Sequence, residues 1–190
     1  MKKLFFVLLC LFLLRSVYAD IVFTEVMYNP TQASDTDLEW IEIYNNGSES
    51  VNLSSWQIDD NSFDDFVIKP KEFVVISREL IDGTDTDNDS FESIYGNNDG
   101  VWTELDGSYK AYDGDFSLTD VDKINLSNLL YSEILEYNTN FGGSGNGKTI
   151  EKIELNQNNF FENWQESKVL GGTPGYNLNS LKENSNKVDV

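Results

Sequence analysis

Apolar and polar side chains alternate along much of the chain, with the period of two residues that is typical of half-buried β-strands. The pattern is clearest in residues 39–46 and 51–58, which a polar turn at Asn46-Gly47-Ser48 separates. It predicts two antiparallel strands that pack one face against a core. The continuous apolar triplet Val74-Val75-Ile76 predicts a further strand near the centre of a sheet. In all, the pattern predicts additional strands over residues 21–27, 63–68, 72–77, 116–118, 123–126, 131–137 and 149–155.

Strand signals at this spacing, without a long helical period, predict a single all-β sandwich domain. Residues 78–112 interrupt the pattern, because they are rich in Asp, Asn, Gly and Ser. This composition predicts a long, loop-rich insertion with little regular structure. Near the end of the chain, Gly171-Gly172-Thr173-Pro174-Gly175 predicts a tight turn that folds a late aromatic side chain, Phe161 or Trp164, over the sandwich.

The alternating runs at 39–46 and 51–58, with residues 21–27 and 73–77 and the glycine-rich segment 171–175, resemble the lamin tail domain family. The resemblance covers nearly all of the chain that follows the N-terminal apolar run, and it is to a stand-alone, secreted member of prokaryotic type. It implies an immunoglobulin-like antiparallel β-sandwich with core positions for three tryptophans. Because the family is defined by its fold, the resemblance implies no particular partner. The three tryptophans are Trp40, Trp56 and Trp164.

The N-terminus has the features of a secretory signal peptide. Lys2 and Lys3 precede an apolar run from Leu4 to Leu14, and Val17-Tyr18-Ala19 offers a signal peptidase site. We expect cleavage after Ala19 (signal peptide 1–19), a folded domain over 20–177 and a disordered polar tail over 178–190. The apolar run is shorter than the roughly 20 residues that span a bilayer, so an uncleaved anchor is the lesser alternative. The protein is therefore expected to be secreted or to lie at the cell surface.

The composition excludes most catalytic mechanisms and one class of partner. The chain contains no histidine, which rules out a Ser-His-Asp triad, a Cys-His dyad and His-ligated zinc. The formal net charge is −20, and the charged residues of the leader are all basic, so its loss would make the charge more negative. Such a charge repels phosphate backbones, so we expect no nucleic-acid partner, whereas basic surfaces and cations are favoured. Carboxylate chemistry stays possible, and one alternative function is a metal-dependent extracellular hydrolase with Asp85, Asp87 and Asp113 as ligands.

An acidic stretch in the insertion is a candidate calcium site. Asp85, Asp87 and Asp89 alternate as the first three ligands of calcium-binding loops do. Ser90 and Gly96 stand where a helix-loop-helix site requires glycine and glutamate. The pattern leaves two alternatives, a weak calcium site and a solvated acidic loop.

The segment Gly142-Gly143-Ser144-Gly145-Asn146-Gly147-Lys148-Thr149 matches the Walker A pattern letter for letter. A phosphate loop must open a helix. Here residues 150–155 are followed at once by Asn156-Gln157-Asn158-Asn159, which leaves room for one or two helical turns at most. The context therefore predicts a hairpin loop, and a nucleotide-binding protein is the less favoured alternative function.

The leading prediction for function is a non-catalytic binding or adhesion module at or outside the cell surface. Binding loops on rigid sandwiches cluster at one end of the sheets, which makes the insertion the expected contact surface. Its isolated aromatic residues are the candidates for contact with a protein or a cell-surface glycan. They are Trp102, Tyr95, Tyr109 and Tyr112.

Overall fold

The computed structural model describes residues 21–31, 36–83 and 89–177. The predicted leader and C-terminal tail lie outside these ranges. None of the helices within the described ranges has the length and apolarity to cross a bilayer.

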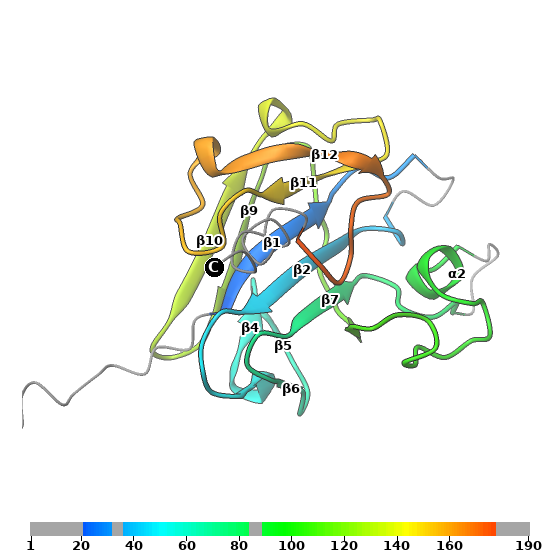
Figure 1. Ribbon diagram of the computed structural model, residues 1–190, viewed down its shortest axis with the longest axis horizontal. Coiled ribbons are helices and arrows are strands. Elements are labelled where there is room, and N and C mark those ends of the chain that lie inside the picture. The colour runs from blue at the N-terminus through cyan, green and yellow to red at the C-terminus, as the bar shows by residue number, and fades with distance from the viewer. Residues whose placement is uncertain (1–20, 32–35, 84–88, 178–190) are drawn as a thin grey trace, which may run out of the picture.

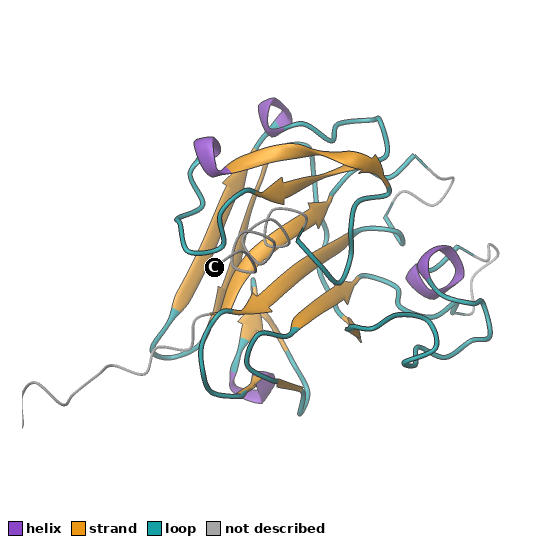
Figure 2. Ribbon diagram, in the orientation of Figure 1, coloured by secondary structure: helices purple, strands orange, loops and turns teal. Residues whose placement is uncertain are grey.

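Strands form two principal sheets (Figure 1, Figure 2). The first has six strands, in which only β7 and β8 run parallel to each other. Their order is β12 (Trp164–Leu170), β11 (Lys148–Lys152), β1 (Ile21–Met27), β2 (Trp40–Asn45), β7 (Phe73–Ser77) and β8 (Lys110–Asp113). The second sheet has the order β10 (Ser132–Tyr137), β9 (Asp122–Ser127), β4 (Gln57–Ile58) and β5 (Asn61–Ser62), and β3 (Val51–Asn52) pairs separately with β6 (Val67–Ile68).

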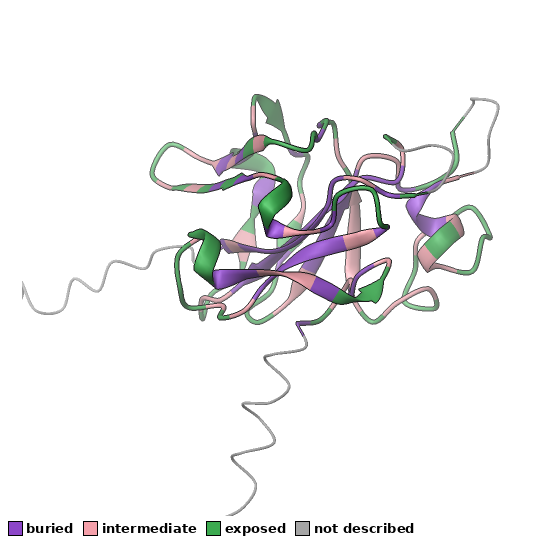
Figure 3. Cartoon of the chain, turned by 90° about the horizontal axis from the view of Figure 1, so that it is seen from above, coloured by how far each residue is buried: buried purple, intermediate pink, exposed green. Residues whose placement is uncertain are grey.

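The main hydrophobic core lies between these sheets, because both contribute side chains to it. Ile41 and Ile43 of β2 share it with Leu126 of β9 and Leu135 of β10. Buried segments follow the central strands, whereas exposed segments gather in the loops (Figure 3). This arrangement confirms the predicted immunoglobulin-like β-sandwich. The core positions of Trp40, Trp56 and Trp164 are also confirmed, since all three are buried.

A β-bulge in β1 decides which of its side chains face the core. The register with β2 shifts between Phe23 and Glu25, so Thr24 is the extra residue. Phe23 lies in the main core before the bulge and Val26 after it, which moves the inward positions from odd to even numbers. As a result Glu25 and Met27 lie on the opposite, outer face of the six-stranded sheet.

A second hydrophobic cluster covers that outer face, with Trp40 and Val75 at its base. Helix α2 (Phe91–Tyr95) packs on them, and the Phe91 and Trp40 rings are 6.1 Å apart in an edge-to-face arrangement. Ser90 begins α2, because its side chain and that of Ser93 form a reciprocal capping box. The described part of residues 78–112 carries little regular structure, as predicted, and what it carries is α2 and most of strand β8.

Four predictions about strands need correction, and the first concerns residues 63–68, of which only β6 (Val67–Ile68) is a strand. Residues 51–58 do not form one strand, because the Asn52 side chain accepts a hydrogen bond from the Ser54 amide at 2.9 Å and starts the short 3-10 helix η1 (Leu53–Ser55). β2 consequently pairs with β1 and β7 instead. Phe116 and Leu118 are buried without forming a strand, and β12 was not predicted.

Replacing Phe91 with alanine should lower the free energy of unfolding by about 3 kcal/mol, because the ring is fully buried and α2 loses its anchor on Trp40. Urea denaturation measures the effect. Phe160→Ala is the matched control, since its ring is 69% exposed, and it should change stability by less than about 0.5 kcal/mol. Equal effects of the two variants would contradict this role of α2.

Candidate functional site

Three glutamates lie side by side on the outer face of the six-stranded sheet. Glu25 of β1 stands opposite Glu42 of β2 on one side and Glu151 of β11 on the other. All three are buried, with exposed fractions of 1%, 0% and 3%. Adjacent buried carboxylates repel each other unless donors or protons compensate their charge.

The C-terminal segment Gly171–Gly175 supplies part of the donors, and Thr24, Thr149 and Gln165 of the sheet supply the others. The Thr173 amide donates to Glu25 at 2.9 Å and its hydroxyl donates to the same carboxylate at 3.0 Å. The Gly175 amide donates to Glu42. Gly172 has a φ of +79°, and a Cβ there would lie 2.5 Å from Glu25 Oε1. The segment thus approaches the sheet closely only because it is rich in glycine.

This finding changes the expected role of the segment. It was predicted to fold Phe161 or Trp164 over the sandwich, but Trp164 lies in the main core at the start of β12 and Phe161 is half exposed. What the segment brings to the sheet is its backbone amides. We call residues 171–175 the C-terminal strap.

The buried pair of carboxyls retains protons more strongly than ordinary glutamates. Burial raises the pKa of Glu25 to about 7, and hydrogen bonds from Thr149 and Thr173 oppose that rise. Burial, and then the charge of Glu25, raise the pKa of Glu42 well above its usual value. No cation contributes to either pKa shift. The repulsion between the two carboxyl groups is therefore relieved when one of them binds a proton.

The Walker-like segment wraps around a carboxylate of the protein itself. Gly142, Gly143, Gly145 and Gly147 all have positive φ, and Lys148 begins β11. Glu166 of β12 accepts from the Gly143 amide at 3.0 Å and ion-pairs with Lys148 Nζ at 3.0 Å. These donors and Asn146 lower the pKa of Glu166 to about 2. The segment opens a strand where a nucleotide site requires a helix. The prediction of a hairpin loop is wrong, because the segment connects β10 to β11, which belong to different sheets and do not pair.

A groove lies between strand β10 and the 3-10 helix η3 (Phe161–Asn163), and its volume is about 570 Å³. Its apolar surface is largely exposed, with Ile134 at 42%, Phe160 at 69% and Phe161 at 50%. Phe141 forms the buried floor and meets Phe161 edge to face at 5.1 Å. We call this hollow the β10 groove. Its lining comprises Glu133, Ile134, Glu136, Phe141, Asn158, Asn159, Phe160 and Phe161.

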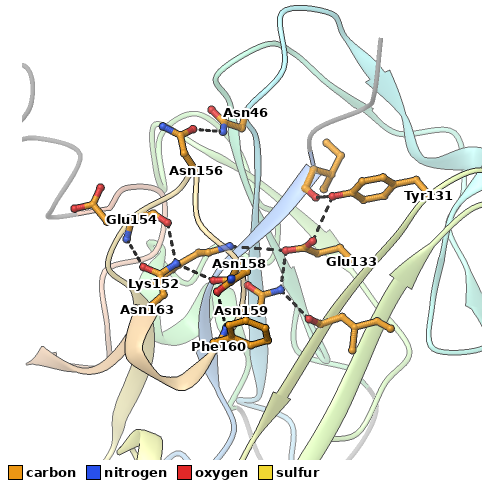
Figure 4. A network of polar contacts seen from close by, with 12 residues as sticks. Asn46, Tyr131, Glu133, Lys152, Glu154, Asn156, Asn158, Asn159, Phe160 and Asn163 are labelled. Atoms are coloured by element: carbon orange, nitrogen blue, oxygen red, sulfur yellow. Dashed lines mark hydrogen bonds and ion pairs between the residues drawn. The ribbon is translucent and has the colours of Figure 1, made fainter. Parts of the chain in front are cut away.

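A polar network fixes one wall of the β10 groove (Figure 4). Asn159 Nδ2 donates to Glu133 at 2.8 Å and to the Ile134 carbonyl at 2.8 Å. Behind Glu133 lies Lys152, whose Nζ is 3.8 Å from Glu133 Oε1 and whose side chain is fully buried. Burial lowers the pKa of Lys152, and the charge of Glu133 opposes that change. Glu133 is thus held in place from the interior, with one edge toward the groove.

The aromatic residues predicted to contact a partner make internal contacts. Tyr95, Trp102 and Tyr109 lie together around α2. Tyr95 donates to the Gly171 carbonyl at 2.7 Å, and a Cβ on Gly175 would lie 2.0 Å from the ring of Tyr109. Tyr95 and Tyr109 therefore support the C-terminal strap, and Trp102 packs against Tyr109. A partner for them stays a prediction.

Tyr112 lies apart from the other three aromatic residues. It packs between Phe63 and Phe66, and its hydroxyl accepts from the Asp64 amide at 2.8 Å. The four candidates consequently do not form one surface.

The acidic candidates are only partly described. Asp85 and Asp87 lie outside the described residues, and Asp89 lies at the edge of them. Asp113 accepts from the Leu80 amide at 2.9 Å, which gives it a structural role. Within residues 21–31, 36–83 and 89–177, no three His, Cys, Asp or Glu side chains are arranged so that they could hold a metal ion together. Calcium binding by Asp85, Asp87 and Asp89 stays a prediction.

A family model described as the lamin tail domain matches residues 15–155. The chain belongs to the lamin tail domain family. Comparisons with curated proteins and with solved structures found no match. The family supports a non-catalytic, immunoglobulin-like module in general terms. The matched region of this lamin tail domain ends before β12, so it excludes both Glu166 and the C-terminal strap, although the resemblance in the sequence extended to residues 171–175.

The buried carboxyl of Glu25 predicts a distinctive pH dependence for this lamin tail domain. Between pH 4.5 and about 7 the folded state keeps a proton that the unfolded chain has released. This group's contribution to stability therefore falls as the pH rises through that window. Glu25→Gln should weaken the dependence by an amount on the order of 2 kcal/mol, measured by urea denaturation at several pH values. Glu49→Gln, at an exposed position, should leave it unchanged.

Glu166→Ala should destabilise the domain by about 1 to 2 kcal/mol at pH 7, because three donors lose their acceptor. Lys148→Ala removes one half-exposed ion pair and should cost less than about 1 kcal/mol. Because the pKa of Glu166 is lowered, its stabilising effect should disappear as the pH falls from 4.5 toward 2.

Thermal unfolding should not respond to millimolar ATP. If ATP raised the unfolding temperature and Lys148→Ala abolished that rise, the segment would be a nucleotide site, which would contradict its assignment as a structural loop.

Proposed function

We propose that the protein acts outside the cell as a non-catalytic binding module and that it contacts its partner at the β10 groove. The observation that carries the proposal is the concentration of exposed apolar side chains in one hollow, Ile134, Phe160 and Phe161. Large exposed apolar side chains that gather in a concave site are typical of binding surfaces, whereas scattered ones are ordinary.

The β10 groove is also pre-formed. Phe141 supports Phe161 from below, and Asn159 ties the loop that carries Phe160 to β10. A rigid surface loses little conformational entropy when it binds, which favours affinity. The aromatic residues of the insertion are less suited to this role, since Tyr95 and Tyr109 already pack against the C-terminal strap.

A non-catalytic role is supported by the engagement of the buried acidic groups. Glu25 and Glu42 accept hydrogen bonds from the strap, and Glu92 accepts from the Asp99 amide at 2.8 Å. Catalytic carboxylates must instead converge on a space that substrate can enter. The predicted leader and the strongly acidic composition support export.

The proposal is tested by the binding of labelled residues 20–190 to the surface of the cells that produce the protein. The double variant Phe160→Ala, Phe161→Ala should weaken saturable binding at least tenfold, because central aromatic contacts usually dominate an interface. Leu129→Ala, Leu130→Ala is the matched control, since both leucines are almost fully exposed on the β9–β10 loop. Wild-type binding by a folded groove variant would contradict the proposal.

A further inference from the structure

The walls of the β10 groove differ in chemistry. Phe160 and Phe161 present aromatic rings on the side of η3, and Glu136 presents an exposed carboxylate on the side of β10. Glu133 lies on the opposite face of that strand, where Asn159 and Lys152 hold its carboxylate. No lysine or arginine belongs to the described lining. Lys152 lies nearby, but its side chain is fully buried behind Glu133 and out of a partner's reach.

We propose that the β10 groove binds a basic, partly apolar segment of another protein. A lysine or arginine of that segment lies between the Glu136 carboxylate and the faces of Phe160 and Phe161. An adjacent apolar side chain covers Ile134. This inference rests on the proposed function, because it names the chemistry of the partner at the same surface.

Charge complementarity argues for a cationic occupant. Aromatic rings attract cations over their faces, and neighbouring carboxylates strengthen that attraction. The formal net charge of −20 steers basic partners toward the protein as a whole. An acidic segment would meet repulsion from both sources, and a purely apolar one would gain nothing from the exposed Glu136 carboxylate.

The two carboxylates differ in how open they are to a partner, and Glu136 is the one that an incoming cation can reach. Glu133 is pre-oriented by Asn159, by Lys152 and by the Tyr131 hydroxyl at 3.3 Å. Glu136 pairs with Lys123 at 2.9 Å, but both side chains are more than half exposed. A surface ion pair of this kind contributes little free energy, so an incoming cation can replace Lys123.

Recognition by side chains fits the groove better than addition of a strand to β10. The Asn159 side chain already occupies the Ile134 carbonyl on the open edge of that strand. Native proteins commonly protect an edge strand by covering it in this way. The volume of about 570 Å³ accommodates a few side chains.

The test is an NMR titration of ¹⁵N-labelled residues 20–190 with a capped tetrapeptide of alternating leucine and lysine. Matched peptides carry glutamine or glutamate in place of lysine. We expect shifts confined to residues 133–136 and 158–161, and binding of the lysine peptide at least tenfold tighter than that of the glutamine peptide. This ratio corresponds to one partly desolvated cation contact. Binding should weaken in Glu136→Gln and Phe160→Ala, and in Glu136→Gln it should also lose most of its salt dependence.

Equal binding of the three peptides, or shifts outside the β10 groove, would overturn the basic-segment inference. If no peptide binds the groove and the Phe160→Ala, Phe161→Ala variant still loses cell-surface binding, the partner chemistry is wrong and the proposed function stands. If that variant keeps cell-surface binding, the proposed function fails whatever the peptides do.

Discussion

The burial of carboxylates on the outer face of the six-stranded sheet is the constraint on which much of the rest depends. Glu25 and Glu42 stand opposite each other on the two central strands, where an open sheet would leave them in water. They are instead fully covered, so their hydrogen bonds must come from the protein. The C-terminal strap provides these bonds through Thr173 and Gly175. A segment more than 130 residues away thereby determines whether the sheet can be buried on both faces.

The insertion completes this arrangement. Helix α2 packs on Trp40, two residues before Glu42 on the same strand, and Tyr95 links α2 to the strap through the Gly171 carbonyl. The aromatic residues of the insertion thus connect the outer cluster to the strap, which leaves three distant parts of the chain interdependent. Loss of any one part would expose to water the buried side chains on which the other two parts pack.

The sequence predicted the strands that have one buried and one exposed face, such as β9 and β10, and it also predicted β2, whose residues are all buried. It missed features that depend on distant residues. The bulge at Thr24 is invisible in the pattern, and Glu42 occupies an alternating position that normally faces solvent. β12 was missed because only Trp164 and Ser167 are buried in it, which gives no alternation.

The proposed β10 groove lies in a different part of the chain from the predicted contact residues, and the reason is physical. Isolated aromatic residues in a polar insertion, such as Trp102, resemble a contact surface when their neighbours are unknown. Phe160 and Phe161 follow a run of asparagines and carry no pattern of their own. Only the fold reveals that β10 lies beside them and that Asn159 connects the two. An amide that bridges distant segments leaves no trace in local periodicity.

Buried charged groups have different roles under the C-terminal strap and beside the β10 groove. Under the C-terminal strap, the buried carboxylates are enclosed by donors and support the packing of the sheet. Beside the β10 groove, a buried Lys152 sits 3.8 Å from Glu133 next to exposed aromatic rings. A buried ion pair seldom stabilises a fold more than apolar residues of similar size would. Exposed phenylalanines add no stability either, so stability alone does not account for the groove. A surface that orients a carboxylate beside aromatic rings accounts for both features together.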